Sequence, residues 1–275
     1  MRRVFMELQA LKDVARQVRR DVITMTNKAG AGHPGGSFSC TEALVALYFD
    51  VMNIDPKDDK NPSRDRFVLS KGHAAPALYG VLCERGYFGR EEFDSFRQLH
   101  GILQGHPDAK KCPGVDASTG SLGQGISIAA GMALGAKLSG NPCHVYTIIG
   151  DGESQEGLVW EASMAAAHYK LDNFTVIFDH NGLQIDGSND EVMSLGDIGA
   201  KWRAFGYDVI EVEDGNDMQQ VLDALHAPAC PGKPRLIHLH TTKGKGVSFM
   251  EGQVGWHGKA PNAEEAARAL KELED

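Results

Sequence analysis

The sequence lacks the cysteine pattern of a disulfide framework or of a zinc–thiolate site. Its five cysteines, Cys40, Cys83, Cys112, Cys143 and Cys230, are scattered, odd in number and contain no CxxC pair. We interpret them as small hydrophobic residues of a protein that works in a reducing compartment.

Long apolar runs and an excess of positive charge are also missing. No segment approaches the roughly 18 consecutive apolar residues that cross a bilayer, and Glu7, Lys12 and Asp13 stand where a secretion signal needs apolar residues. The 28 Lys and Arg residues are outnumbered by 37 Asp and Glu, which gives a formal charge of −9. An acidic chain offers no general basic surface to nucleic acid or to an anionic membrane. We therefore expect a cytoplasmic protein with neither as a partner.

The pattern that is present alternates β-branched apolar runs with helical segments. Strands are predicted at residues 145–150, 174–179, 207–212 and 234–241, and residues 67–69 are a short apolar run. Helices are predicted at residues 6–28, 41–50, 125–138, 153–170 and 218–226, and a capping box at Asn262 and Glu265 begins a last, Ala-rich helix. Strand–helix–strand units favour parallel pairing with right-handed crossovers. The predicted fold class is α/β, a mostly parallel sheet with helices on both faces.

Polar residues follow two of these strands where a ligand of a parallel sheet binds. Gly150, Asp151 and Gly152 lie between a strand and a predicted helix, whose N-terminal N–H groups favour an anion. Asn181 follows the next strand, so its amide oxygen and the Asp151 carboxylate can bind one Mg²⁺ ion together with a loop carbonyl such as that of Leu183. Ca²⁺ and Mn²⁺ accept the same oxygen ligands. Alternatively, Asp151 caps the helix and Asn181 begins a turn.

At this point the sequence resembles transketolase, a thiamine diphosphate enzyme. The resemblance rests on GDGESQEG (150–157) and DHNGLQIDG (179–187), in which a GDG turn is followed about thirty residues later by an Asn. Five further runs match transketolase segments in family order, namely GHPGG (32–36), RFVLSKGHAAPALY (66–79), GHP (105–107), TGSLGQG (119–125) and WHGKAP (256–261). The likeness extends almost from end to end and implies the thiamine diphosphate-binding fold.

The resemblance implies a set of residues that bind the cofactor. Asp151, Asn181 and the Leu183 carbonyl would hold the metal ion. The residues implied to contact thiamine diphosphate itself are His73, Gly120, Ser121, Leu122, Gly152, Ile185, Lys243 and His257. Of these, His73 and Gly152 would contact the diphosphate, and Ile185 would pack on the thiazolium ring.

The residues implied to act in catalysis are His33, His73, His106, His257 and Glu156. Histidine can donate, accept or carry a proton near neutral pH, which suits a site that binds sugar hydroxyls and moves protons. In the family, a glutamate at the position of Glu156 contacts its counterpart across a subunit interface. The other histidines that we considered, among them His144, His168, His238 and His240, are interpreted as structural.

A complete transketolase is more than twice as long as this chain. Residues 1–275 correspond to its first domain, so we expect the pyrimidine-binding and C-terminal domains on a partner chain, in an α2β2 assembly. The implied activity is transfer of a two-carbon ketol unit from a ketose phosphate to an aldose phosphate, as in the pentose phosphate pathway. Two alternatives remain: a related thiamine diphosphate enzyme, such as a deoxyxylulose-phosphate-synthase-like chain or a 2-oxo acid dehydrogenase α chain, and a non-catalytic binding module.

Overall fold

Five parallel strands form the central sheet of the chain, whose computed structural model describes residues 6–274. The strand order is β1-β2-β3-β7-β6, and every neighbouring pair is parallel. The strands are β1 (Arg66–Leu69), β2 (Val145–Gly150), β3 (Phe174–His180), β6 (Asp208–Val212) and β7 (Arg235–His240). The four predicted strands are confirmed, with ends that differ by one residue at most, and the short apolar run at residues 67–69 lies in β1.

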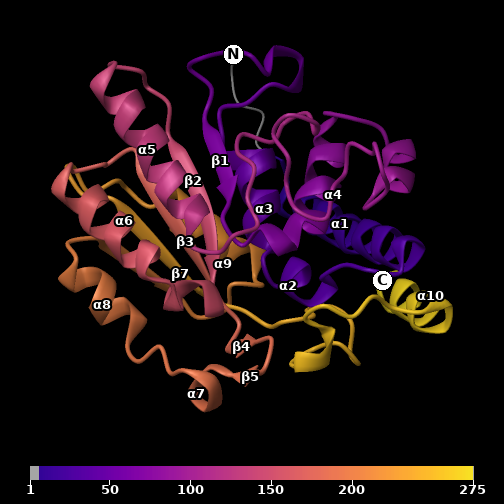
Figure 1. Cartoon of the computed structure of the whole chain (residues 1–275). Coiled ribbons are helices and arrows are strands. Elements are labelled where there is room, and N and C mark those ends of the chain that lie inside the picture. Colours follow the sequence, from indigo (N-terminus) through magenta and orange to yellow (C-terminus); the bar gives the residue numbers. More distant parts are fainter. Residues whose placement is uncertain (1–5, 275) are drawn as a thin grey trace.

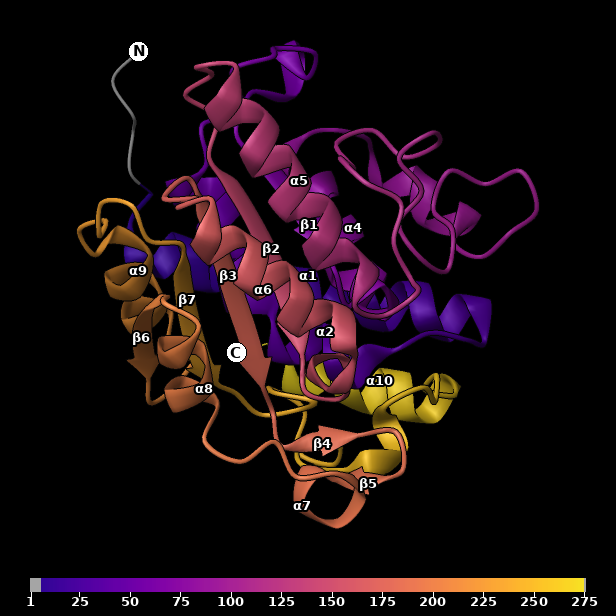
Figure 2. The same cartoon turned by 60° about the vertical axis from the view of Figure 1, so that its left-hand side comes forward.

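Helices cover both faces of this sheet (Figures 1 and 2). On one side lie α1 (Leu8–Ala29), α2 (Pro34–Ser39), α3 (Thr41–Ala46), α4 (Ala75–Arg85) and α9 (Met218–His226). On the same side, α10 (Ala263–Glu272) packs on α1. The other side carries α5 (Gln124–Leu138), α6 (Gly157–His168) and α8 (Ile198–Ala204). A small hairpin of β4 (Leu183–Gln184) and β5 (Gly187–Ser188) precedes α7 (Asn189–Val192). The predicted fold class is confirmed.

The strands divide their side chains between two hydrophobic cores, as the two-residue repeat of a strand requires. Tyr146 and Ile148 of β2 belong to the larger core under α1, α3 and α4. Val145 and Ile149 belong to the second core under α5, α6 and α8. Because both faces are buried, the strands read as nearly continuous apolar runs.

The predicted start of the helix after Asp151 differs from the structure. The helix expected at residues 153–170 begins only at Gly157, because a 3₁₀ turn, Gly152–Gln155, comes first and Glu156 is extended at φ −72° and ψ 133°. The Glu153 carboxylate holds this turn by accepting hydrogen bonds from the N–H groups of Gly123 and Gly150, at 3.0 and 3.2 Å. The anion-binding helix N-terminus predicted directly after Asp151 is therefore wrong, and a tight turn occupies that position.

The Gly-rich segment after α1 ends that helix but also begins another. Gly30 adopts a left-handed φ of 61° and terminates α1. Pro34 then starts α2, where its fixed φ and missing N–H suit the first helical position. From the sequence, this Gly-rich segment was predicted only to end the first helix, and α2 was not predicted. No helix among residues 6–274 combines the length and apolarity needed to span a membrane.

A π-helical turn, Leu47–Val51, continues α3. The remaining short helical turns lie in the connections, at Pro56–Asp58, Gly72–Ala74, Arg90–Ser95 and Val254–Trp256. The turn Gly72–Ala74 follows β1 directly, and Gly152–Gln155 follows β2. Both therefore lie at the carboxyl edge of the sheet, beside the β4–β5 hairpin that follows β3. This edge is where ligands bind in open parallel sheets.

Candidate functional site

A cavity of about 280 Å³ opens at the carboxyl ends of β1, β2 and β3. It is lined by Gly36, Lys71, His73, Leu122, Gly150, Asp151, Gly152, Glu153, Gln155, Asn181, Leu183, Gln184, Ile185, Lys243 and His257. Most of the residues predicted to bind the cofactor are in this lining, although they come from segments spread over more than 180 positions of the chain.

Asp151 and Asn181 lie side by side at the ends of neighbouring strands, since Gly150 of β2 pairs with Asp179 of β3. The Oδ2 atom of Asp151 accepts a hydrogen bond from the Asn181 backbone N–H at 2.9 Å, and Oδ1 accepts one from the Asn189 side-chain amide at 2.7 Å. Asp151 is only 3% exposed. Burial, followed by repulsion from Asp179, raises the pKa of Asp151 to about 7. This carboxylate therefore lies in a position that favours a cation.

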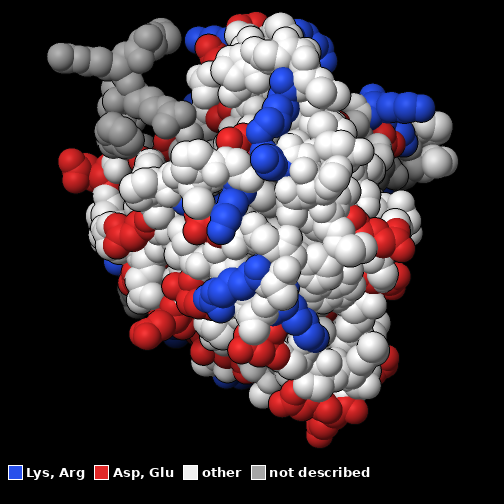
Figure 3. Space-filling view, turned by 90° about the vertical axis from the view of Figure 1, so that its left-hand side faces the viewer, with Lys and Arg blue, Asp and Glu red and all other residues white. Residues whose placement is uncertain are grey.

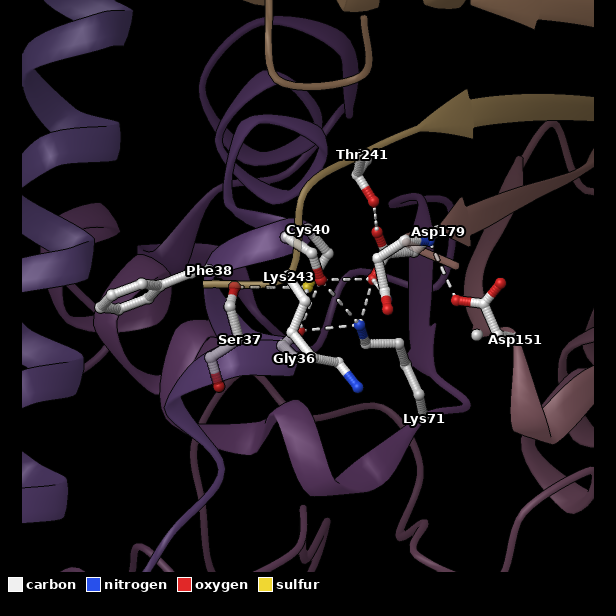
Figure 4. A network of polar contacts seen from close by, with 12 residues as sticks. Gly36, Ser37, Phe38, Cys40, Lys71, Asp151, Asp179, Thr241 and Lys243 are labelled. Carbon is white, nitrogen blue, oxygen red and sulfur yellow. Dashed lines mark hydrogen bonds and ion pairs between the residues drawn. The ribbon is translucent and has the colours of Figure 1, made fainter. Parts of the chain in front are cut away.

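A buried ion pair between Lys71 and Asp179 supports the floor of the cavity (Figure 4). Lys71 also donates to the Gly36 carbonyl at 2.7 Å. Asp179 accepts further hydrogen bonds from the hydroxyls of Ser39 and Thr241. Burial opposes the charge of Asp179, but Lys71 and these donors outweigh it and keep its pKa below the ordinary value. Asp179 is thus neutralised within the protein, and Asp151 is not.

Lys243 places a second positive charge on the cavity wall, in a position labelled in Figure 4. Its Nζ atom donates to the Leu183 carbonyl at 3.0 Å and lies 3.1 Å from Nδ1 of His257. Burial, followed by repulsion from Lys71, lowers the pKa of Lys243 to about 8. Neither contact of Lys243 is with a carboxylate, so an anion in the cavity would stabilise its charge.

Three of the predicted histidines, His33, His73 and His257, form one cluster. The ring centroids lie 5.3 Å apart for His33 and His73, 5.6 Å for His33 and His257, and 5.1 Å for His73 and His257. Burial is the first cause of a lowered pKa in each, to about 4 for His33 and about 3 for His257. All three rings are therefore neutral at pH 7 and can both donate and accept a hydrogen bond.

The TGSLGQG loop brings Leu122 to the cavity, whereas Gly120 and Ser121 do not line it. Gly120 has a φ of +143° and lies against His106, whose ring would be 3.0 Å from an added Cβ. His106 itself borders a separate cavity of about 500 Å³ together with Asp108. The predicted residue His106 is therefore near the site but outside its lining.

Glu156 also lies outside the cavity lining. It is exposed at the start of α6, beside Gly123, which has no room for a side chain because an added Cβ would lie 2.9 Å from that of Glu156. A surface position is compatible with an interface residue rather than with a group that touches a ligand of this chain.

The charges of the cavity fit a metal ion bound to a diphosphate. Asp151, the Asn181 side chain and the Leu183 carbonyl are oxygen donors of the kind that Mg²⁺ prefers. Lys71, Lys243 and the neutral histidines are donors suited to phosphate oxygens. Burial, followed by repulsion from a like charge, destabilises the ionised forms of both Asp151 and Lys243, as their opposite pKa shifts indicate. A ligand that carries both signs of charge, such as a metal ion bound to a diphosphate, stabilises both ionised groups.

Four residues important to this arrangement were not singled out from the sequence: Lys71, Glu153, Asp179 and Asn189. Lys71 and Asp179 each stand at the end of an apolar strand, a position where a charged residue is either exposed or buried with a partner. Their spacing alone does not reveal the pairing, because more than a hundred residues separate them. The signal available was that both charged residues come at the carboxyl ends of buried, apolar strands.

The family model for the transketolase thiamine diphosphate binding domain matches residues 10–274. The chain is 42% identical over 271 residues to one subunit of the apulose-4-phosphate transketolase of Phocaeicola vulgatus, covering 98% of this chain and 96% of that protein. It is 44% identical over 265 residues to 6-deoxy-6-sulfo-D-fructose transketolase subunit SqwG of Clostridium sp., covering 96% of each.

Among solved structures, transketolase from Campylobacter jejuni superposes with a TM-score of 0.92 at 34% identity. The match covers 98% of this chain and 43% of the Campylobacter chain, so the similarity is to less than half of that longer enzyme. Since the family model and the two subunit relatives each span nearly the whole chain, the chain belongs to the transketolase family, as its thiamine diphosphate-binding, N-terminal subunit of the split form.

Proposed function

We propose that this chain binds thiamine diphosphate and Mg²⁺ and, together with a C-terminal subunit, transfers a two-carbon ketol unit from a ketose phosphate to an aldose phosphate. The observation that carries the proposal is the cavity in which an un-neutralised carboxylate, Asp151, and a lysine without a carboxylate partner, Lys243, face one space. The two subunit relatives support it by their names, which specify different sugars. For this reason we carry over the reaction class and not one particular sugar.

In this proposal Asp151, Asn181 and the Leu183 carbonyl hold the metal ion, with Mg²⁺ preferred because all three ligands are oxygens. His73, Gly152 and Lys243 meet the diphosphate, and Lys71 adds positive charge behind them. Leu122 and Ile185 supply apolar surface for the ring portion of the cofactor. Gly120 and Ser121 contribute through the loop that carries Leu122.

Bound thiamine diphosphate supplies the carbanion chemistry, and the protein supplies binding, orientation and proton positions. The neutral rings of His33, His73 and His257 can bind the hydroxyl groups of a sugar and accept or return their protons. His106, at the edge of a neighbouring cavity, is placed to meet the more distant hydroxyls of the substrate. These residues are the catalytic groups that this subunit contributes.

An apolar surface on the α5 and α6 side of the molecule supports the proposal of a partner subunit. Figure 3 shows that uncharged residues cover much of this side. Ile128 and Leu138 of α5 and Met164 of α6 are 39%, 79% and 53% exposed. Glu156 lies at the start of α6 on the same surface, which suits its proposed contact across an interface. We propose an α2β2 assembly in the cytoplasm, in keeping with five unpaired cysteines.

The binding half of the proposal is tested by calorimetric titration of the purified chain with thiamine diphosphate in the presence of Mg²⁺. Loss of a residue that only hydrogen-bonds to a metal ligand weakens metal binding roughly 10- to 100-fold. Asp151→Ala removes a ligand itself and should weaken binding by more than that. Asp172→Ala, at an exposed ion pair with Lys137, is the matched control and should leave binding unchanged. Unaltered affinity in Asp151→Ala would contradict the assigned metal site.

The catalytic half is tested by producing this chain with a second chain that carries a pyrimidine-binding domain, encoded beside it. Ketol transfer from xylulose 5-phosphate should require both chains, Mg²⁺ and thiamine diphosphate. Activity of this chain alone, or a pair that binds the cofactor but transfers no ketol unit from any ketose phosphate, would refute the proposed reaction.

A further inference from the structure

Three histidines meet at the carboxyl ends of β3 and β7, outside the cavity lining. The parallel register pairs His180 with His240, and Phe178 with His238. The ring centroids of His180 and His238 are 5.0 Å apart, those of His238 and His240 are 4.5 Å apart, and those of His180 and His240 are 5.3 Å apart. One ring nitrogen from each residue lies within 4.8 Å of the other two. Three ring nitrogens this close together can bind one metal ion.

The outer contacts of these rings are those of metal-binding histidines. Nε2 of His238 lies 2.8 Å from Nδ1 of His180, and the other nitrogen of His238, Nδ1, lies 2.6 Å from the Glu211 carboxylate on β6. Glu211 in turn accepts a hydrogen bond from Arg203 at 3.0 Å. A histidine that binds a metal through one nitrogen almost always donates its other N–H to a carboxylate, a carbonyl or water. In His238 a carboxylate, that of Glu211, lies within 2.6 Å of this second nitrogen and can take that role.

His180 also has a carboxylate, that of Asp151, near the nitrogen that faces away from His238. Its Nδ1 faces His238, and its Nε2 lies 3.6 Å from Oδ1 of Asp151. A metal ion on Nδ1 would fix the tautomer that carries hydrogen on Nε2, which then points to Asp151. The histidine cluster is thus connected through one ring to the carboxylate at the edge of the cofactor cavity.

Burial decreases across the three histidines. His238 is 5% exposed, His180 is half-buried and His240 is exposed. One side of the cluster is therefore anchored in the sheet and the other is open to solvent, which leaves room for water as a further ligand. Tetrahedral binding at about 2.0–2.1 Å requires ring nitrogens about 3.3 Å apart. The ion would replace the 2.8 Å hydrogen bond between His180 Nδ1 and His238 Nε2, and these two nitrogens need to separate by about half an ångström to reach that spacing.

We propose that His180, His238 and His240 form a binding site for a divalent transition metal ion, with Zn²⁺ as its occupant. Imidazole nitrogens suit Zn²⁺, whereas Mg²⁺ selects oxygen ligands, so this site and the oxygen site at Asp151 bind different ions. The proposal does not depend on the reaction that the chain catalyses.

The test uses the purified full chain, freed of metal and titrated with Zn²⁺ alone and with Co²⁺ alone. One equivalent should bind saturably, and Co²⁺ should give the intense visible absorption of a four-coordinate ion. His240→Ala, at an exposed position, should weaken binding at least about 10-fold, and Glu211→Gln should weaken it by roughly 10- to 100-fold because it removes the outer carboxylate. His168→Ala, at the exposed end of α6, is the matched control and should bind as the unaltered chain does.

The cluster of His33, His73 and His257 is the alternative place where the added Zn²⁺ or Co²⁺ could bind. Circular dichroism spectra that match the unaltered chain establish that each variant is folded. Absence of saturable binding would overturn the proposal. Binding that survives His240→Ala and is lost in His257→Ala would overturn it too, since the ion would then lie in the cofactor cavity.

Discussion

The buried ion pair of Lys71 and Asp179 makes the stability of the chain depend on one lysine. Lys71 is 1% exposed and Asp179 is fully buried. Lys71→Met keeps the length and apolar stem of the side chain but removes its charge. The change leaves the Asp179 carboxylate buried with neutral donors alone, from Ser39, Thr241 and the Asn181 amide. It also leaves the Gly36 carbonyl without its lysine donor.

Removal of one partner from a buried ion pair costs about 3–5 kcal/mol, and the lost hydrogen bond to Gly36 adds about 1 kcal/mol. Against a total unfolding free energy of roughly 5–15 kcal/mol, this loss is large. Asp179 has a lowered pKa in the native protein, so the stabilisation by the pair is complete above the ordinary carboxyl pKa and is lost as pH falls through the native value. The difference between Lys71→Met and the unaltered chain should therefore be full at pH 7 and shrink below about pH 4.

The measurement is urea denaturation followed by far-UV circular dichroism at pH 7, with the free energy extrapolated at a common slope. Lys137→Met is the matched control, because Lys137 pairs with Asp172 at 2.7 Å in a half-exposed position. Such exposed pairs contribute about 0–1 kcal/mol. If both variants lose the same small amount, the reasoning that Lys71 neutralises a buried carboxylate is refuted.

Three further predictions concern other parts of the chain. Burial lowers the pKa of His144 to about 4, so the unfolded state binds more protons than the native state between about pH 4 and 6.5. The free energy of unfolding therefore rises with pH across this range. In urea titrations, His144→Gln should remove up to about 3 kcal/mol of that rise. Gly72→Ala should weaken thiamine diphosphate binding measured by calorimetry, because its Cβ would lie 2.7 Å from the Gly120 backbone nitrogen. Gly131→Ala, in α5 with nothing within 4 Å of its Cβ, should instead raise the unfolding free energy by about 0.5–1 kcal/mol.

The central strands were predictable because both faces of the sheet are buried. β2 and β3 are nearly continuous apolar runs, the pattern that burial on both faces favours. The start of α6 was not predictable from its local sequence. The hydrogen bonds from Gly123 and Gly150 to Glu153 determine it, and Gly123 is thirty residues away.

The candidate site follows the same division between local and distant contacts. Asp151 and Asn181 could be placed together because consecutive strands of a strand–helix–strand unit are neighbours, as the pairing of β2 with β3 confirms. The grouping of His180 with His238 and His240 could not be foreseen. It depends on β7 being the other neighbour of β3, and no local pattern in the sequence encodes strand order. His238 and His240, interpreted as structural from the sequence, thereby acquire a proposed ligand.

The contrast between Asp151 and Asp179 explains how one sheet edge both stabilises itself and remains able to bind an ion. Both carboxylates are buried at the ends of neighbouring strands, so burial alone would raise both pKa values. Lys71 reverses that effect for Asp179, whereas Asp151 receives two neutral amide donors and keeps a pKa of about 7. An internal lysine directed at Asp151 instead would have satisfied the carboxylate that faces the cavity. The position of Lys71 beside Asp179 therefore preserves an acidic group for an external cation, while Lys243 preserves a basic group for an external anion.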